Sequence, residues 1–513
     1  MSDFHKDSFL EFAPPVEFGG PTTPILETTS PDLSNAEIQE IITQSRTFID
    51  SAINEEIKAS YLMEWLTYAL YSSVKMRQES TVRDICSIVF KLAEKDIDTL
   101  STLLEKNFEV GPFKGQALLF VWMNALYSST FDARTYTNIV AINYIFAYVI
   151  EHTTLEFSSA LTKAVEEGQE QGKSPFILML LSLIQAAQTR FNQPATTHIA
   201  KFLLFCMGKY PEATSQVLIQ PIAAGAFHNK HGLYLLANAL KFSVKDNSET
   251  SQIICKVLGD MVHYVAADSL ANALLAKIAR GPQEGLVPLH IILRSLTSAA
   301  YVNDSNHETI KAVIDMLEQF FNIIPLPTII HALSEEIVSK DHTYGGKHGI
   351  RMLVEAFIAG MEHGHDMSAL MALFSKLINS NPALLMNALT REINEKPSCL
   401  EYIIRKYNEA AESTTLSVQI GELLRKIDES LSLDEKVLWN AHVTKIYASL
   451  MPAATEVSTE VAAGTEASAA AIDTTETPSH YTKARFFSTV HSTALMAREH
   501  DQEDNPTPPS RLH

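Results

Sequence analysis

The chain has 513 residues, of which 46% are apolar, and its formal net charge is −20. The acidic balance argues against a nucleic-acid partner, because affinity for a phosphate backbone rests on Lys and Arg side chains. The longest apolar runs, such as 140–150, are shorter than the roughly 20 residues that a membrane-spanning helix needs. We therefore expect a chain with ample material for a core and no transmembrane segment.

The N-terminal residues 1–33 are rich in Pro and Gly, with aromatic residues on both sides of Pro14 and Pro15. Such a segment cannot bury enough apolar surface to offset the entropy of ordering, so we expect a disordered leader. A short docking motif is the alternative interpretation. The first helix is predicted to start at Ser34, because Ser34 and Glu37 have the spacing of a capping box.

A leucine recurs six times in the chain, at intervals of 57, 57, 56, 59 and 56 residues. These column leucines are Leu104, Leu161, Leu218, Leu274, Leu333 and Leu389. Apolar residues also recur four positions later, at position +4: Phe108, Val165, Ile222, Ile278, Ile337 and Ile393. Such offsets lie on one face of an α-helix, and a fixed period of this length indicates a repeat array. We expect the column leucine and the +4 residue to share a helix.

Each repeat is predicted to contain three helices, the first being the most apolar. The expected fold is all-α, a right-handed α-solenoid of about six three-helix repeats of 56–59 residues with capping helices. The predicted solenoid domain covers 34–451, with repeats near 57–111, 112–170, 171–227, 228–281, 282–341 and 342–396 and a C-terminal cap at 397–451. Two first helices begin alike, with Lys230-His231-Gly232 and with Lys347-His348-Gly349.

The three-helix pattern over 34–451 resembles the armadillo/HEAT class of α-solenoids. The resemblance lies in periodicity and helix pattern, and the present repeats are longer than the roughly 40–47 residues usual for that class. It implies that the third helix of each repeat lines the binding surface of the array.

Two positions before each column leucine, at position −2, the helix is predicted to face away from the apolar stripe. The six residues there, which we call the polar ladder, are Thr102, Ser159, Gln216, Asn272, His331 and Asn387. Amide groups supply a hydrogen-bond donor and an acceptor together, which is what a peptide backbone requires. The ladder therefore predicts a binding surface for a protein or an extended peptide. The alternative is an ordinary polar helix face.

The C-terminal part is predicted to lie outside the solenoid. Residues 452–480 contain five acidic and no basic residues, which is typical of a disordered linker. The tail 481–513 includes an apolar pattern at Phe486, Phe487 and Val490 that predicts a short amphipathic helix, able to dock on the body or on a partner. The acidic block 499–504 resembles the translocation signals of bacterial type IV secreted effectors, which implies a protein that acts inside a host cell.

The cysteines Cys86, Cys206, Cys255 and Cys399 are far apart, so we expect buried thiols in a reducing, cytoplasmic compartment. Gly168 to Ser174 is similar to a phosphate-binding loop but has three residues between its glycines where four are needed, and it follows no strand.

The sequence contains no catalytic signature, and we expect a non-enzymatic interaction scaffold without catalytic residues, cofactor or metal. The alternative is a metal-binding protein or metal-dependent enzyme, because histidines cluster with carboxylates near the sixth repeat. That cluster comprises His342, His348, Glu362, His363, His365 and Asp366. The sequence leaves the oligomeric state open.

Overall fold

The computed structural model describes residues 33–51, 56–109, 111–132, 135–166, 170–188, 193–224, 227–279, 283–302, 306–339, 344–393, 397–410 and 414–450. Within these ranges the chain is all-α, with 22 α-helices and isolated β-bridges but no strand. The predicted linker and tail, and the leader up to residue 32, lie outside them. The chain divides into two compact units, Met1–Ala279 with Val287–Ile292 and Arg280–Leu286 with Leu293–His513.

Between α1 (Asn35–Ser51) and α22 (Leu433–Leu450), two longer helices and a short one recur in chain order. The first helices are α2 (Glu56–Lys75), α5 (Leu118–Ser129), α8 (Pro175–Gln188), α11 (Gly232–Ser243), α14 (Pro288–Ala300), α17 (Gly349–Glu362) and α20 (Cys399–Glu409). The second helices are α3 (Glu79–Lys95), α6 (Tyr136–His152), α9 (Gln193–Lys209), α12 (Ser248–Asp260), α15 (His307–Ile323), α18 (Ser368–Ser380) and α21 (Thr415–Ser430). The short helices are α4 (Ile97–Glu105), α7 (Ser158–Thr162), α10 (Pro211–Ile219), α13 (Ala267–Leu275), α16 (Leu326–Ser334) and α19 (Pro382–Thr390).

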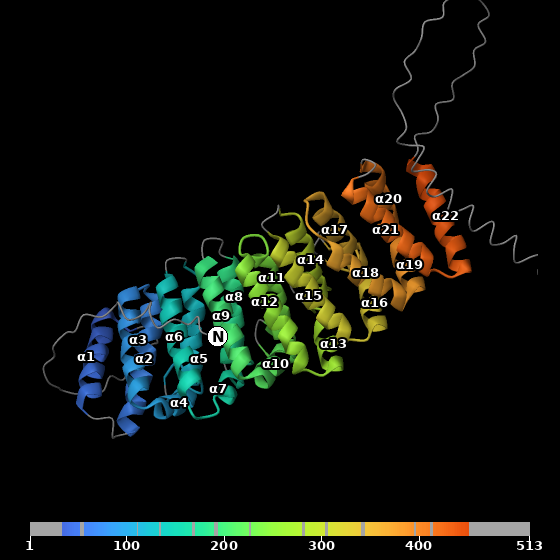
Figure 1. Ribbon diagram of the computed structural model, residues 1–513. Helices are drawn as coiled ribbons and strands as arrows, with labels where there is room; N and C mark the ends of the chain where they lie inside the picture. The colour runs from blue at the N-terminus through green and yellow to red at the C-terminus, as the bar shows by residue number, and fades with distance from the viewer. Residues whose placement is uncertain are drawn as a thin grey trace, which may run out of the picture. The chain divides into compact units, whose positions relative to one another are not determined.

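In the first unit, the first helices form one layer and the second helices another (Figure 1). Helices α2, α5, α8 and α11 pack on one another in order, as do α3, α6, α9 and α12. Helix α8 is apolar on every side, and its residues from Phe176 to Leu181 are at most 4% exposed. Helix α3 buries only one stripe, which includes Val82, Ile85 and Val89. These patterns explain the layers, because a helix that is apolar all round must be covered on all sides.

In the second unit, like helices also pack on like. Helix α17 contacts α20, α18 packs between α15 and α21, and α16 packs on α19. The short helices α16 and α19 also contact the first helix that follows each of them, α17 and α20. Helix α22 packs on α19 and α20.

The helices at the two ends of the described chain both begin with a capping box. At α1, the Ser34 N–H donates to Glu37 Oε2 at 2.7 Å, and the Glu37 N–H donates to Ser34 Oγ at 3.4 Å. The Ser34 hydroxyl also donates to Glu37 Oε2 at 2.6 Å, and this bond, followed by that from the Ser34 N–H, lowers the pKa of Glu37. At α22, Ser432 and Glu435 make the same two N–H bonds, at 2.8 and 3.4 Å. The predicted start of the first helix is therefore confirmed.

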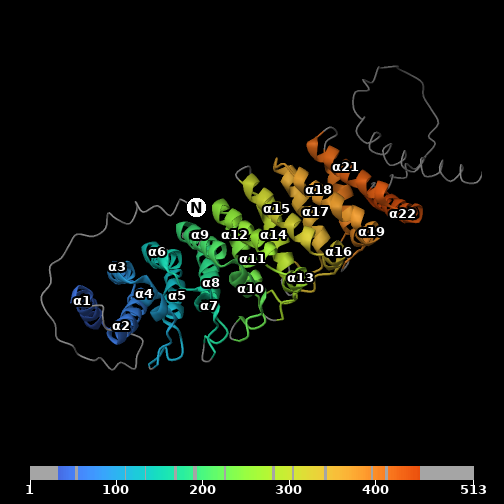
Figure 2. The same cartoon turned by 60° about the horizontal axis from the view of Figure 1, so that its bottom comes forward.

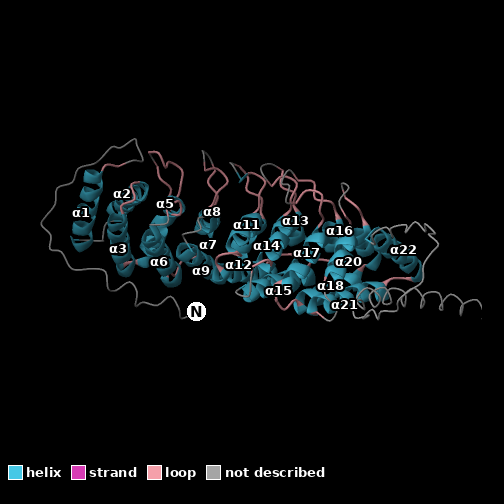
Figure 3. Ribbon diagram, turned by 90° about the horizontal axis from the view of Figure 1, so that it is seen from above, coloured by secondary structure: helices cyan, strands magenta, loops and turns pink. Residues whose placement is uncertain are grey.

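A hairpin loop joins the short helix to the next first helix in four of the repeats. The Val165 N–H donates to the Lys173 carbonyl at 2.9 Å, and the Gly172 N–H donates back to the Val165 carbonyl at 2.9 Å. The same exchange occurs at the other +4 residues Phe108, Ile222 and Ile337. In the first unit these loops lie on the side of α5, α8 and α11, away from α6, α9 and α12 (Figure 3).

Each hairpin loop closes through a residue with positive φ: Gly115 (79°), Gly172 (80°), Asn229 (61°) and Gly346 (70°). Glycine suits this position because a Cβ disfavours the left-handed region. At Gly172 a Cβ would also lie only 2.7 Å from the backbone nitrogen of Ala224, in the next hairpin loop. The loop that contains Gly172 therefore approaches the next hairpin loop at the backbone.

Two first helices begin with a glycine that touches a column leucine. A Cβ on Gly232 would lie 2.9 Å from the Cα of Leu218, and one on Gly349 would lie 3.1 Å from the Cα of Leu333. The similar Lys-His-Gly sequences before these helices thus mark two places where the first helix starts directly against the leucine.

We expect Gly172→Ala to destabilise the protein more than Gly115→Ala. Both residues have φ near +80°, so each substitution costs roughly 1–2 kcal/mol for the left-handed backbone. A Cβ at Gly115 meets no atom within 4 Å, whereas one at Gly172 meets the Ala224 backbone at 2.7 Å. Relieving that clash should cost a further ~1–3 kcal/mol. Thermal unfolding of both variants checks this, and equal losses would contradict the close approach of the loops.

Candidate interaction surface

Each short helix ends one residue after its column leucine. The six column leucines are at most 2% exposed, which confirms their predicted place in the core. The residue at position +2 is the helix C-cap and has extended φ and ψ angles in all six helices. The short helices are five to nine residues long, so each has at most about two and a half turns.

The prediction that each short helix continues to the residue at position +4 is wrong. The +4 residues are buried, at 1–9% exposed, but they lie on the extended segment beyond the helix. In four hairpin loops the N–H of the +4 residue donates to the loop carbonyl instead of to a helical carbonyl. An apolar side chain can reach the core from an extended backbone or from a helix. The pattern of apolar residues alone therefore does not distinguish the two conformations.

All six residues of the polar ladder are exposed on the short helices. The hydroxyl of Thr102 donates to the carbonyl of Asp98 at 2.9 Å, within α4. The His331 Nε2 lies 3.3 Å from Glu335 Oε1. The other four side chains make no hydrogen bond or ion pair to the described residues; they are Ser159, Gln216, Asn272 and Asn387.

In the first unit, three ladder residues come from neighbouring helices. Helix α10 packs on both α7 and α13, so Ser159, Gln216 and Asn272 belong to adjacent short helices. These helices follow one another along one side of the unit (Figure 2). The structure therefore places these three side chains on adjacent helices, and none of them makes a hydrogen bond to the described residues.

Helix α4 is fastened to the C-terminal end of α6 by a carboxylate that sequence reasoning missed. Asp98 accepts hydrogen bonds from the Thr154 N–H at 2.9 Å, the Thr154 hydroxyl at 2.7 Å and the Thr153 hydroxyl at 3.0 Å. These bonds, chiefly those from Thr154, lower the pKa of Asp98. The clasp holds α4, the helix that carries Thr102, against α6.

In the second unit, His331 and Asn387 lie on α16 and α19, which pack on each other. Ion pairs border them: Arg391 Nη2 lies 3.8 Å from Glu336 Oε2, and Lys445 Nζ lies 3.4 Å from Glu392 Oε1. These exposed pairs are each worth about 0–1 kcal/mol. They give this part of the ladder a charged border.

A lysine follows the left-handed residue in three hairpin loops, and each one is engaged within the chain. Lys173 forms an ion pair with Glu170, which gives the loop similar to a phosphate-binding loop a structural role. Lys230 Nζ lies 5.4 and 5.1 Å from the ring centroids of Phe227 and Tyr234, and burial lowers its pKa. Its counterpart at position 347 pairs with a buried glutamate.

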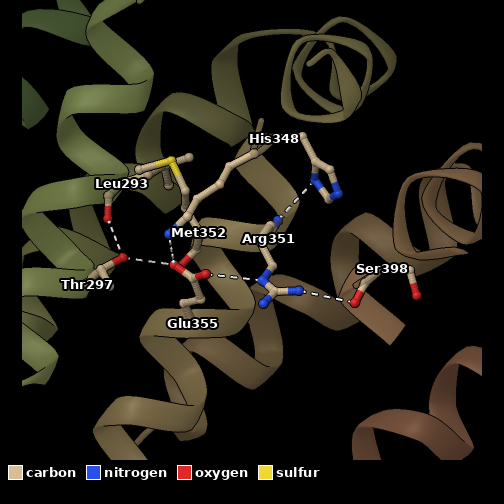
Figure 4. A network of polar contacts seen from close by, with 8 residues as sticks. Leu293, Thr297, His348, Arg351, Met352, Glu355 and Ser398 are labelled. Carbon is tan, nitrogen blue, oxygen red and sulfur yellow. Dashed lines mark hydrogen bonds and ion pairs between the residues drawn. The ribbon is translucent and has the colours of Figure 1, made fainter. Parts of the chain in front are cut away.

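That glutamate, Glu355, is 9% exposed and lies between two cations in the second unit (Figure 4). Lys347 Nζ is 2.8 Å from Glu355 Oε2, and Arg351 Nε is 3.1 Å from Oε1. Arg351 also donates to the Ser398 carbonyl at 3.1 Å and lies 4.1 Å from the centroid of the Tyr402 ring. The network fastens α17 to the start of α20. In the sequence, this network is recognisable from the four-residue spacing of Lys347, Arg351 and Glu355.

The histidines of the metal hypothesis have separate surroundings. His348 begins α17, and its Nδ1 accepts the Arg351 N–H at 3.0 Å. The His363 ring lies 6.0 Å from that of Tyr301, and His365 Nε2 is 2.7 Å from the Val302 carbonyl. In the described part of the chain, no three His, Cys, Asp or Glu side chains form a group that could hold a metal. His342 lies outside that part.

The four cysteines are all buried and form no disulfide, as predicted. Burial raises the pKa of the Cys86, Cys206 and Cys399 thiols. The docking residues Phe486, Phe487 and Val490 lie outside the described residues. No helix within the described ranges is long and apolar enough to cross a membrane.

Comparisons of the chain with protein-family models, curated proteins and solved structures find no match.

The His348 network predicts a pH dependence of stability. Burial first, and then Arg351 and Arg391, lower the pKa of His348 from 6.5 to about 4. Between these values the unfolded chain binds a proton that the folded chain does not, so the free energy of unfolding decreases as the pH falls through this window. Asn at 348 keeps a hydrogen-bond acceptor for the α17 cap without titrating.

We expect the melting temperature of His348→Asn to fall less between pH 7 and pH 5 than that of the unmodified protein. The slope should remain above zero, because burial also lowers the pKa of His198 to about 4. The control is Gln252→Asn, at an exposed position without a titratable group, which should keep the full slope. Parallel curves for His348→Asn and the unmodified protein would contradict the prediction.

Proposed function

We propose that this chain is a right-handed α-solenoid of three-helix repeats that acts as a non-enzymatic scaffold and binds an extended peptide on its polar ladder. The observation that carries the proposal is the ladder itself. All six of its side chains are exposed beside buried leucines, and four of them make no bond to the described residues.

The solenoid interpretation is supported within each unit. The order of two longer helices and a short one recurs, and first helices pack on first helices as second helices do on second helices. In a repeat array each repeat contacts mainly its neighbours, which is this pattern. The hairpin loops add a second recurring element, since Gly172 approaches the following loop at Ala224.

The spacing of the short helices suits an extended peptide. Packed helices lie about 8–10 Å apart, and an extended chain advances roughly 3.3 Å per residue. Side chains on adjacent short helices would therefore meet every third peptide residue. Gln216 and Asn272 offer both donors and acceptors, and Ser159 offers a hydroxyl, so each can bond to a peptide N–H or C=O.

Two loop lysines already form ion pairs within the chain, which makes a binding site based mainly on charge less favourable. In the hairpin loops Lys173 pairs with Glu170, and Lys347 pairs with Glu355. The groups that remain for a partner on the ladder of the first unit are neutral. Recognition would then rest on backbone hydrogen bonds, with sequence preference set by the neighbouring side chains.

A displayed library of 10- to 12-residue peptides, on the order of four ladder contacts long at this spacing, provides the probe. Selected peptides are titrated against the unmodified protein and against Ser159→Ala with Gln216→Ala and Asn272→Ala. Each lost hydrogen bond should cost ~0.5–1.5 kcal/mol. We therefore expect the Kd to rise at least about tenfold, since tenfold corresponds to about 1.4 kcal/mol.

The matched control is Ser87→Ala with Gln252→Ala, exposed positions on the second helices α3 and α12. We expect it to leave the Kd unchanged, and both variants should melt like the unmodified protein because exposed substitutions cost less than about 0.5 kcal/mol. A selection without binders would contradict the proposal, as would binders that tolerate the ladder variant.

A further inference from the structure

Helix α22, the last described helix, buries one face and exposes apolar side chains on the other. Its inner face is held by Trp439, Val443 and Ile446, which are at most 8% exposed. On the outer face, Leu433 is 66% exposed, Val437 55% and Leu438 56%. Leu433, Val437 and the exposed Ala441 follow a spacing of four residues, so they form one stripe along the helix.

Helix α1, at the other end of the described chain, has a polar outer face. Within residues 35–47 of this helix, Ile38, Ile41, Ile42 and Ser45 are buried, while Gln39 and Thr43 are exposed. A terminal helix of a repeat array needs such a face, because no further repeat covers it. By the same argument, we expect another segment to pack on the apolar stripe of α22.

The chain beyond α22 contains a segment with matching chemistry. Residues 481–498 carry Phe486, Phe487 and Val490 at the spacing of one helical face, and they contain three bases and no acid. Residues 33–450 contain 45 acidic and 35 basic residues, a net charge of −10, so this basic segment is attracted to the body. Apolar area and charge both favour binding of this segment to the body.

The connection is long enough for the segment to reach α22. Residues 451–480 can span up to about 100 Å at ~3.3–3.6 Å per residue, whereas α22 is about 27 Å long at ~1.5 Å per residue. Attachment to the same chain also gives the segment an effective concentration on the order of millimolar. A weak apolar contact is then sufficient for binding.

We propose that residues 481–498 dock on the outer face of α22, with their apolar residues against Val437 and Leu438. The docked segment covers the apolar stripe and turns its own polar side chains outward. This interaction is independent of the polar ladder, which lies on the short helices.

Thiol labelling in the full chain tests the docking. Ala441→Cys places a thiol on the stripe without removing its larger side chains, and the four native cysteines are buried. We expect a maleimide to label this thiol slowly in the otherwise unmodified chain. Adding Phe487→Asp with Val490→Asp should speed the labelling at least about tenfold, because acids on the apolar face of the segment oppose its burial.

Two controls match these variants. Ser488→Asp with Ser492→Asp adds the same charge on the other side of the predicted helix and should leave the labelling slow. Thr43→Cys, on the exposed face of α1, should be labelled quickly in every background. Labelling of Ala441→Cys as fast as that of Thr43→Cys would overturn the proposal.

Two further results would also overturn it. If labelling is slow but accelerates on dilution, a second copy of the chain covers the stripe. If labelling stays slow in the Phe487→Asp and Val490→Asp background at every concentration, the cover is not this segment. Acceleration only with the apolar-face acids supports docking within one chain.

Discussion

Burial of one leucine in the last turn of each short helix is the constraint on which the described repeats depend. Burying a leucine stabilises by about 1.5–3 kcal/mol, and six such residues are almost inaccessible to solvent. Directly after the leucine the chain becomes extended and exchanges hydrogen bonds across a hairpin loop, as Val165 does with Lys173. The loop returns the chain to the same leucine, where Gly232 and Gly349 begin the next first helix.

The same constraint determines which side chains remain for a partner. Position −2 lies ~200° around the helix from the leucine, so burying one exposes the other. Two lysines of the hairpin loops are engaged within the chain, Lys173 with Glu170 and Lys347 with Glu355. At position −2 the short helices of the first unit expose a neutral set of amides and hydroxyls, on which the proposed peptide site rests.

Buried polar groups in the second unit fix how α17 meets α20. Removing one partner of a buried ion pair leaves an uncompensated charge, so Glu355 and its two cations must be kept or replaced together. His348 adds a neutral imidazole as the cap of α17. At the end of this unit, α22 has an apolar outer face that its own packing does not cover.

The sequence by itself determined the all-α class, the period, the buried leucines, the exposed ladder and the capping box at Ser34. Each of these depends on side-chain spacing or on contacts between residues close in the chain. Helix ends and partners were decided by the tertiary structure. Ile222 is buried from an extended backbone because its N–H bonds to the Lys230 carbonyl, and a burial pattern is the same for either conformation. The bonds of Asp98 to Thr153 and Thr154, and the contacts of Arg351 with Ser398 and Tyr402, likewise depended on which segments the fold brought together.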